Sequence, residues 1–513
     1  MKLLILNIRS SRRRMTDSLL RNPRRRLLGI LLLCTLGITN MVAAEPWLDT
    51  RDAGLRMDIE RLSNAGIIKV PINTRPLMWA GILADLEASD ERALPEKLIN
   101  SYARVVTAGR KASLINRPHQ SVRLSAADQS QLFRHFGDKS RDEAELTLRR
   151  NGMTEHFAYN LEVTKSFNPW DGEQISYDNS YFGIVLGNWV GLIGSVERWW
   201  GPSWNSSLIL TNNARPMTGL MLQRNYSEAF DFTLLEWLGP WTTSMFITEL
   251  DDDRFIKNAK LVGMTVGFRP IDSLELNLRR TAQWGGDGRP QSGKSFLKLL
   301  TGIADNCGEL SCKSEEPGNQ LGGIDFRWDL PWQDASIYGQ TVGEDEAGAL
   351  PSRRAHQLGA QLHFSSQWFE GAVFFEHDET SLKSAKKAFN TLYNHSIYRT
   401  GYRYQGRVIG ATWDNDSTVT SLGITGHLAS GDKFEARYSF GDINVDRLEA
   451  DLKSRHSITN TKTSLSTLAA KWQRPFDWGE LEIEGRYTDQ IIDQFGRQEE
   501  KFRLAASVNY YFY

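Results

Sequence analysis

FRLAASVNYYF, residues 502–512, alternates between two kinds of side chain along its whole length. One set is largely apolar and the other is small or polar: Phe502, Leu504, Ala506, Val508, Tyr510 and Phe512 against Arg503, Ala505, Ser507, Asn509 and Tyr511. Successive side chains of a strand point to opposite faces, so this pattern predicts a strand with one apolar face. The chain then stops on Tyr513. A closing strand that ends in aromatic residues is typical of outer-membrane β-barrels, whose aromatic rings lie at the membrane interfaces.

The same period of two begins near residue 120 and continues through the rest of the chain. Residues 259–268, 273–284 and 480–490 alternate apolar with charged, polar or glycine positions. A soluble sandwich also alternates, but the terminal strand favours an all-β transmembrane barrel with lipid outside and a polar lumen. Residues 145–513, at about 20 residues for each strand with its connection, predict about 16 to 20 antiparallel strands.

The N-terminus has the composition of an export signal. Residues 1–26 carry nine basic residues and one acidic residue, and the apolar run Leu27–Thr39 and the small residues Val42-Ala43-Ala44 follow. The run is shorter than the roughly 20 apolar residues that a spanning helix needs, so we expect a signal peptide over 1–44. A lipobox at Cys34 and a twin-arginine signal are weaker alternatives. The whole chain carries −1 and this segment +8, so the mature chain carries −9, which disfavours nucleic acid as a partner.

Residues 45–119 have a helical period instead. Leu55, Ile59 and Leu62 share one helix face, and Gly66 is placed to end that helix. Residues 78–86 and 94–106 predict two further amphipathic helices. These segments are too polar to lie in lipid, so we expect a small helical bundle on the periplasmic side that closes one barrel mouth. The predicted division is signal peptide 1–44, helical bundle 45–119 and barrel 120–513.

Several segments resemble the capsule assembly protein Wzi family. They are ERWWGP at 197–202, ARPMTG at 214–219, LQR at 222–224, QWGGDGRPQS at 283–292, EPGNQL at 316–321, YGQ at 338–340 and GEDEAG at 343–348. The resemblance implies an 18-stranded barrel with a periplasmic helical bundle, and a lectin-like role that holds capsular polysaccharide at the cell surface. Residues 375–460 look least like the family, so the bound glycan can instead be an exopolysaccharide.

Aromatic and arginine side chains within these motifs are candidate sugar contacts. Trp199, Trp200 and Trp284 can stack on pyranose rings, but Trp-Gly-Pro and Trp-Gly-Gly are also common in structural turns. Arg215, Arg224 and Arg289 can pair with uronic-acid carboxylates. The alternative for these arginines is a lumenal salt bridge with an acid of the 344–346 run. We expect the ligand near the outer loops, including 285–320 and 376–415. The basic stretches Lys383–Lys387 and Arg399–Arg407 can attract an anionic glycan, and the alternative for both is a solvated loop.

The sequence lacks a recognisable catalytic or metal motif. None of the nine histidines lies in an HExxH arrangement and no Gly-x-Ser-x-Gly elbow is present. Glu249–Asp253 reads as a solvated turn rather than a calcium loop. Cys307 and Cys312 are predicted to form a disulfide in an exported chain. We therefore expect a monomeric, non-enzymatic barrel without cofactor or metal, in contact with lipopolysaccharide and inserted by the barrel-assembly machinery. The alternatives are a diffusion channel for small solutes and a glycan-trimming enzyme.

Overall fold

The computed structural model describes residues 45–114, 119–301, 318–344, 353–383, 387–445, 456–494 and 497–512. The predicted signal peptide, Tyr513 and the pair Cys307 and Cys312 lie outside the described residues. None of the described helices is both long and apolar enough to cross a membrane.

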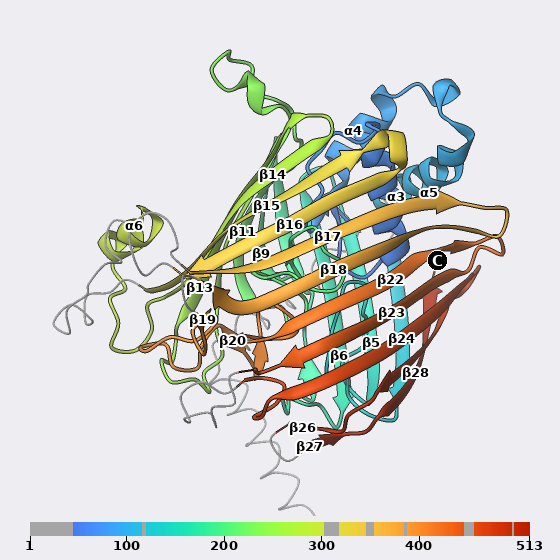
Figure 1. Cartoon of the computed structure of the whole chain (residues 1–513). Helices are drawn as coiled ribbons and strands as arrows, with labels where there is room; N and C mark the ends of the chain where they lie inside the picture. The colour runs from blue at the N-terminus through green and yellow to red at the C-terminus, as the bar shows by residue number, and fades with distance from the viewer. Residues whose placement is uncertain are drawn as a thin grey trace, which may run out of the picture.

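An antiparallel sheet closes on itself to form the body of the molecule (Figure 1). Over the described residues, twenty strands join this sheet. Two of them, the two-residue strands β7 (Ile175–Ser176) and β19 (Lys387–Ala388), are not needed to close it, because β6 pairs directly with β8 and β18 pairs directly with β22. Eighteen strands therefore form the wall, within the predicted range. They are β4 (His119–Ala127), β5 (Ala144–Met153), β6 (Phe157–Phe167), β8 (Tyr181–Leu186), β9 (Trp189–Ser195), β11 (Thr218–Arg224), β12 (Trp241–Glu249), β13 (Lys260–Ile271), β14 (Leu274–Trp284), β15 (Gly318–Leu330), β16 (Ala335–Glu344), β17 (Arg353–Ser365), β18 (Phe369–Lys383), β22 (Thr418–Leu428), β23 (Lys433–Ile443), β24 (Thr463–Phe476), β25 (Gly479–Thr488) and β28 (Phe502–Phe512).

The last strand closes the barrel against the first. β28 pairs with β4 from Ala505↔Ala127 to Phe512↔Gln120. Its side chains divide as the sequence pattern predicts: Phe502 is 69% exposed on the outside, whereas Arg503 is 3% exposed and faces the lumen. β25 repeats this arrangement, with Ile483 outside and Glu482 and Glu484 buried inside. The strand alternation and its orientation are confirmed.

The two ends of the barrel differ in their connections. At one end, here called the short-turn end, two residues join β8 to β9, β13 to β14 and β24 to β25. At the opposite end, here called the loop end, the connections are long, as in residues 196–217 between β9 and β11. Figure 1 shows the helices α3, α4 and α5 and the C-terminus at the short-turn end, and α6 (Gly293–Thr301) outside the wall at the loop end.

The helical N-terminal region forms as predicted. α3 (Ala53–Asn64) begins at its cap Asp52, which accepts a hydrogen bond from Leu55 N–H at 2.9 Å. Gly66, at φ +74°, allows the turn that follows this helix. α4 (Trp79–Ala88) and α5 (Glu96–Ala112) follow, and their apolar faces pack with α3 around Ile59, Leu62 and Val105.

Shorter elements complete the chain. They are β1 (Trp47–Leu48), β2 (Thr74–Arg75), β3 (Leu77–Met78), β10 (Trp199–Trp200), β20 (Arg403–Tyr404), β21 (Arg407–Val408), β26 (Ile492–Gln494), β27 (Arg497–Glu499) and the 3-10 turns η1 (Glu91–Ala93), η2 (Glu236–Leu238) and η4 (Pro331–Gln333). β1 pairs with β3, and β2 pairs with β10 inside the barrel. The β2–β10 pair therefore joins the N-terminal region to the β9–β11 connection.

The lumen is filled from both ends. Every residue of α3 is buried, and the helix lies against β15 and β22. From the loop end, residues 130–138, 196–217 and 407–417 are buried throughout. The expectation of outward loops over 376–415 was therefore wrong for much of that range, because the segment 401–404 and the stretch from 407 onward fold into the lumen. Two arginines of the expected tract Arg399–Arg407 also lie inside the barrel: Arg403 pairs with Asp414 at 2.8 Å, and Arg407 donates to the carbonyls of Leu132 and Gln131. Arg399, in contrast, is exposed.

Candidate functional site

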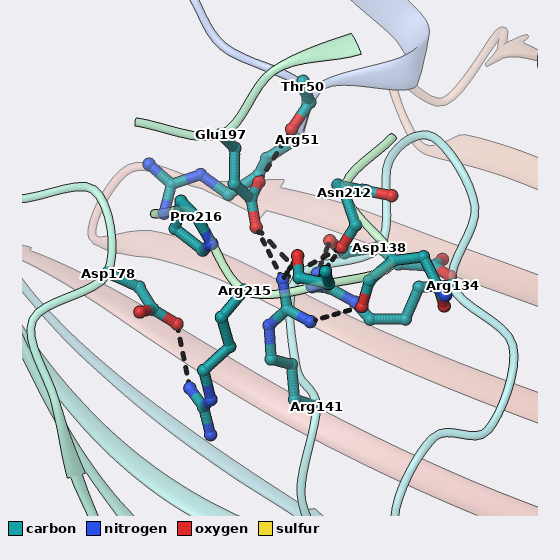
Figure 2. Close-up of polar contacts among 12 residues, drawn as sticks. Thr50, Arg51, Arg134, Asp138, Arg141, Asp178, Glu197, Asn212, Arg215 and Pro216 are labelled. Atoms are coloured by element: carbon teal, nitrogen blue, oxygen red, sulfur yellow. Dashed lines mark hydrogen bonds and ion pairs between the residues drawn. The ribbon is translucent and has the colours of Figure 1, made fainter. Parts of the chain in front are cut away.

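Arg215 lies at the centre of a buried ion cluster that ties three loop-end connections together. Figure 2 shows its contact with Asp178. Its guanidinium donates to Asp178 at 2.8 Å, to Asp142 at 3.2 Å and to Asp171. Burial alone would lower the pKa of Arg215, but these carboxylates outweigh it and raise the pKa well above the ordinary value. At 6% exposed, the side chain is a structural tie between loops. For Arg215 the structure therefore shows the salt-bridge alternative, and its partners are these three aspartates instead of an acid of the 344–346 run.

Glu197 forms a second buried cluster next to the first (Figure 2). It accepts a hydrogen bond from Thr50 Oγ1 at 2.7 Å and lies 3.3 Å from Arg141 and 3.5 Å from Arg134. Burial alone would raise the pKa of this carboxyl, and the two arginines instead hold the pKa below its usual value. Thr50 lies two residues before Asp52, the cap of α3, so this cluster couples the N-terminal helical region to the loop end.

Trp199 and Trp200 lie inside the barrel, and neither is exposed. The Trp199 indole N–H donates to the Ser203 carbonyl at 3.1 Å, and its ring meets Phe136 edge-on at 5.5 Å. Trp200 contacts Phe246 at 5.3 Å between ring centroids. In this arrangement neither ring presents a face to solvent, so sugar stacking by this pair stays a prediction that needs the lumenal segments to move.

Trp284 and Arg289 both lie at the loop end. Trp284 is at the end of β14 and faces outward, where Phe296 of α6 covers it with ring centroids 5.1 Å apart. The Arg289 guanidinium lies 6.0 Å from the Tyr398 ring and is half-buried. Of the six predicted contact residues, Arg289 is therefore the one that reaches the surface beside the loops.

Arg224 is at the opposite end of the barrel. It ends β11 at the short-turn end, stacks over Trp241 at 3.8 Å and donates to the carbonyls of Glu228 and Trp241 at 2.9 and 2.8 Å. The structure thus does not bring the six predicted residues together. Three of them lie inside the barrel, and the other three lie on the outer wall (Trp284), at the loop-end surface (Arg289) and at the short-turn end (Arg224).

A surface patch that sequence reasoning did not assemble lies beside Arg289. Phe255 is 57% exposed in the β12–β13 connection, and the Arg399 guanidinium lies over its ring at 4.5 Å. The Phe255 N–H donates to Thr400 Oγ1 at 2.8 Å, which fixes the two connections to each other. Phe255, Arg289 and Arg399 are called the loop-end patch below. The basic tract Arg399–Arg407 was a partial signal for it, whereas Phe255 carried none.

Acidic residues in the same connection are placed as predicted for a turn. Asp251 pairs with Arg254 at 3.1 Å, and Asp252 and Asp253 are exposed. Across the described ranges, no group of three or more His, Cys, Asp or Glu side chains is arranged to hold a metal ion.

Comparison with known proteins identifies the family. The sequence model of the family described as capsule assembly protein Wzi matches residues 114–504. The chain belongs to the Wzi family. A similar solved structure comes from Escherichia coli and is described as Wzi, an outer membrane protein involved in group 1 capsule assembly and a carbohydrate-binding β-barrel. It superposes with a TM-score of 0.77 at 25% identity, and the match covers 91% of this chain and 99% of that one.

A similar protein of Klebsiella pneumoniae is described as an uncharacterized 55.8 kDa protein in the cps region, and it is 32% identical to this chain over 350 residues. The match covers 66% of this chain and 66% of that relative, which is just under two thirds of the relative's length. The OprD outer membrane protein of Pseudomonas aeruginosa aligns with a TM-score of 0.42 at 9% identity, over 77% of this chain and 93% of that one. As a Wzi-family barrel, this chain is a capsule assembly protein of the outer membrane.

Proposed function

We propose that the protein holds capsular polysaccharide or exopolysaccharide at the cell surface as a non-enzymatic, lectin-like barrel. The observation that carries the proposal is the filled lumen: α3 occupies it from one end and residues 196–217 occupy it from the other. A diffusion channel needs an open path for its solute. A barrel whose lumen is filled by segments tied together through buried ion pairs instead has a rigid surface at the loop end. The Escherichia coli Wzi structure, described as carbohydrate binding, supports the same function.

The proposed orientation places the loop end outside the cell. Outer-membrane barrels have short periplasmic turns and longer extracellular loops. By this rule α3, α4 and α5 lie on the periplasmic side, where they close the barrel mouth, and residues 1–44 direct export before they are removed. We propose a monomer inserted by the barrel-assembly machinery.

We propose the loop-end patch as a glycan contact. An exposed aromatic face such as that of Phe255 can bury the C–H surface of a sugar ring. The guanidinium groups of Arg289 and Arg399 can each pair with a carboxylate of an acidic polymer. Trp199, Trp200 and Arg215 would then act by supporting the loops that form this end. Contacts repeated along a polymer give retention through avidity rather than through one tight site.

Surface retention in a deletion strain tests the proposal. We expect the strain to make polymer but shed it, so that the cell-associated fraction falls while the total stays the same. Complementation with Phe255→Ala or Arg399→Ala should restore retention only in part. The matched controls are Phe232→Ala and Arg92→Gln, which alter an exposed aromatic and an exposed arginine at the short-turn end. Both controls should restore retention fully, and unchanged retention in the deletion strain would reject anchoring.

Purified polysaccharide distinguishes the enzymatic alternative. Incubation of the purified barrel with the polymer should leave its chain length unchanged. Release of oligosaccharide by the wild-type protein would show a trimming enzyme instead.

A further inference from the structure

Two adjoining grooves cross the outer, lipid-facing surface of the wall. The first, of about 610 Å³, runs over β8 to β13 and is lined by outward apolar side chains that include Ile184, Leu220 and Ile247. The second, of about 650 Å³, runs over β12 to β17 and includes Leu278 and Ile324. Met245 and Met264 line both. The described residues that line the two grooves include no Asp or Glu.

Outward-facing glycines leave these hollows open. Gly191 lines the first groove and Gly322 the second, and a Cβ added at either position would meet no atom within 4 Å. A wall that is hollowed at two neighbouring places offers more apolar contact to chain-like ligands than a convex barrel surface does, because each CH₂ group is covered on more than one side.

Cations are placed along the loop-end side of the grooves. Arg280 and Arg354 line the second groove, and Arg280 donates to the Gln320 side chain. Above the first groove, α6 packs Phe296 against the wall at Trp284. The guanidinium groups of Arg280 and Arg354 match the phosphate groups of a lipid head.

We propose that the adjoining grooves and the cations beside them bind lipid A, the phosphorylated and multiply acylated disaccharide of lipopolysaccharide. Two side-by-side grooves accept more acyl chains than a two-chain phospholipid supplies. The separated cations suit a head group with two phosphates. The inference rests on the orientation proposed above, which puts the loop end in the outer leaflet, and not on glycan anchoring.

Native mass spectrometry of the full mature protein in detergent tests the site. After incubation with hexa-acylated bisphosphorylated lipid A, we expect one lipid to be retained in preference to phosphatidylglycerol. The double variant Gly191→Leu/Gly322→Leu fills both grooves and should lower retention at least tenfold. Gly485→Leu is the matched control, because Gly485 also faces outward with no atom within 4 Å of an added Cβ, but on β25. It should retain lipid A like the wild type.

The phosphate contact is tested separately. Because Arg280 stays in place, Arg354→Gln should lower retention of bisphosphorylated lipid A part of the way toward the level that dephosphorylated lipid A reaches with the wild type. A heat-dependent gel shift verifies that each variant is folded, and the Arg354→Gln result stands if the double variant does not fold. Equal retention of phosphatidylglycerol, equal loss in Gly485→Leu, or unchanged retention in Arg354→Gln would each overturn the proposal.

Discussion

At the scale of single residues, the buried arginines of the loop end are structural ties, and Arg215 alone contacts three carboxylates. Replacing Arg215 with Ala leaves Asp142, Asp171 and Asp178 buried or partly buried without their shared cation. Loss of one partner from a buried ion pair costs about 3 to 5 kcal/mol. We expect Arg215→Ala to lower the free energy of unfolding in urea by about 3 kcal/mol, with loop-end proteolysis at lower urea. Arg92→Ala, at an exposed position, should change it by less than about 0.5 kcal/mol, and equal effects would contradict this role.

The same residues show what the sequence could and could not predict. The inward or outward direction of Arg503 and Ile483 was predictable, because it depends only on a period of two within one strand. The partners of Arg215 were not, since Asp171 and Asp178 lie in a different connection, and only the closed barrel brings the loops together. The burial of Trp199 and Trp200 depends on long-range contacts in the same way. The connection that carries them lies in the lumen only because other connections fold in beside it, and a single sequence does not show these partners.

At the scale of elements, α3 is held in the lumen by carboxylates, which makes its docking depend on pH. Burial alone would raise the pKa of Glu60, but Arg56 and Arg327 outweigh it and hold the pKa at about 2, from an ordinary 4.5. The pKa of Asp58 is also lowered, by Arg104 and His427 against the effect of burial. A lowered folded-state pKa contributes stability above the unfolded pKa that is lost as pH falls through the folded pKa.

We therefore expect the amides of α3 to lose protection from hydrogen exchange, after correction for intrinsic rates, as pH falls from about 4.5 toward 2. The pair that holds the helix to the wall is the one between Glu60 and Arg327 of β15, 3.6 Å apart, which protonation of the Glu60 carboxyl removes. Glu60→Gln should lower α3 protection at pH 7 and flatten its pH dependence. Protection of β14 amides in the wall serves as the internal control. A pH profile of α3 that Glu60→Gln leaves unchanged would show that other groups hold the helix.

At the scale of the whole molecule, the filled lumen decides between a platform and a channel. In planar bilayers we expect the wild-type protein to give no steady conductance. A variant that lacks residues 45–78 loses α3 and the β2 strand, yet residues 196–217 and 407–417 still fill the lumen from the loop end. Its conductance should therefore remain far below that of an open barrel. The two buried ion clusters explain this, because their charges are paired across different connections and cannot separate without a large desolvation cost. Steady conductance from the wild-type protein would favour a diffusion channel, and open-barrel conductance in the truncated variant would show that α3 alone blocks the path.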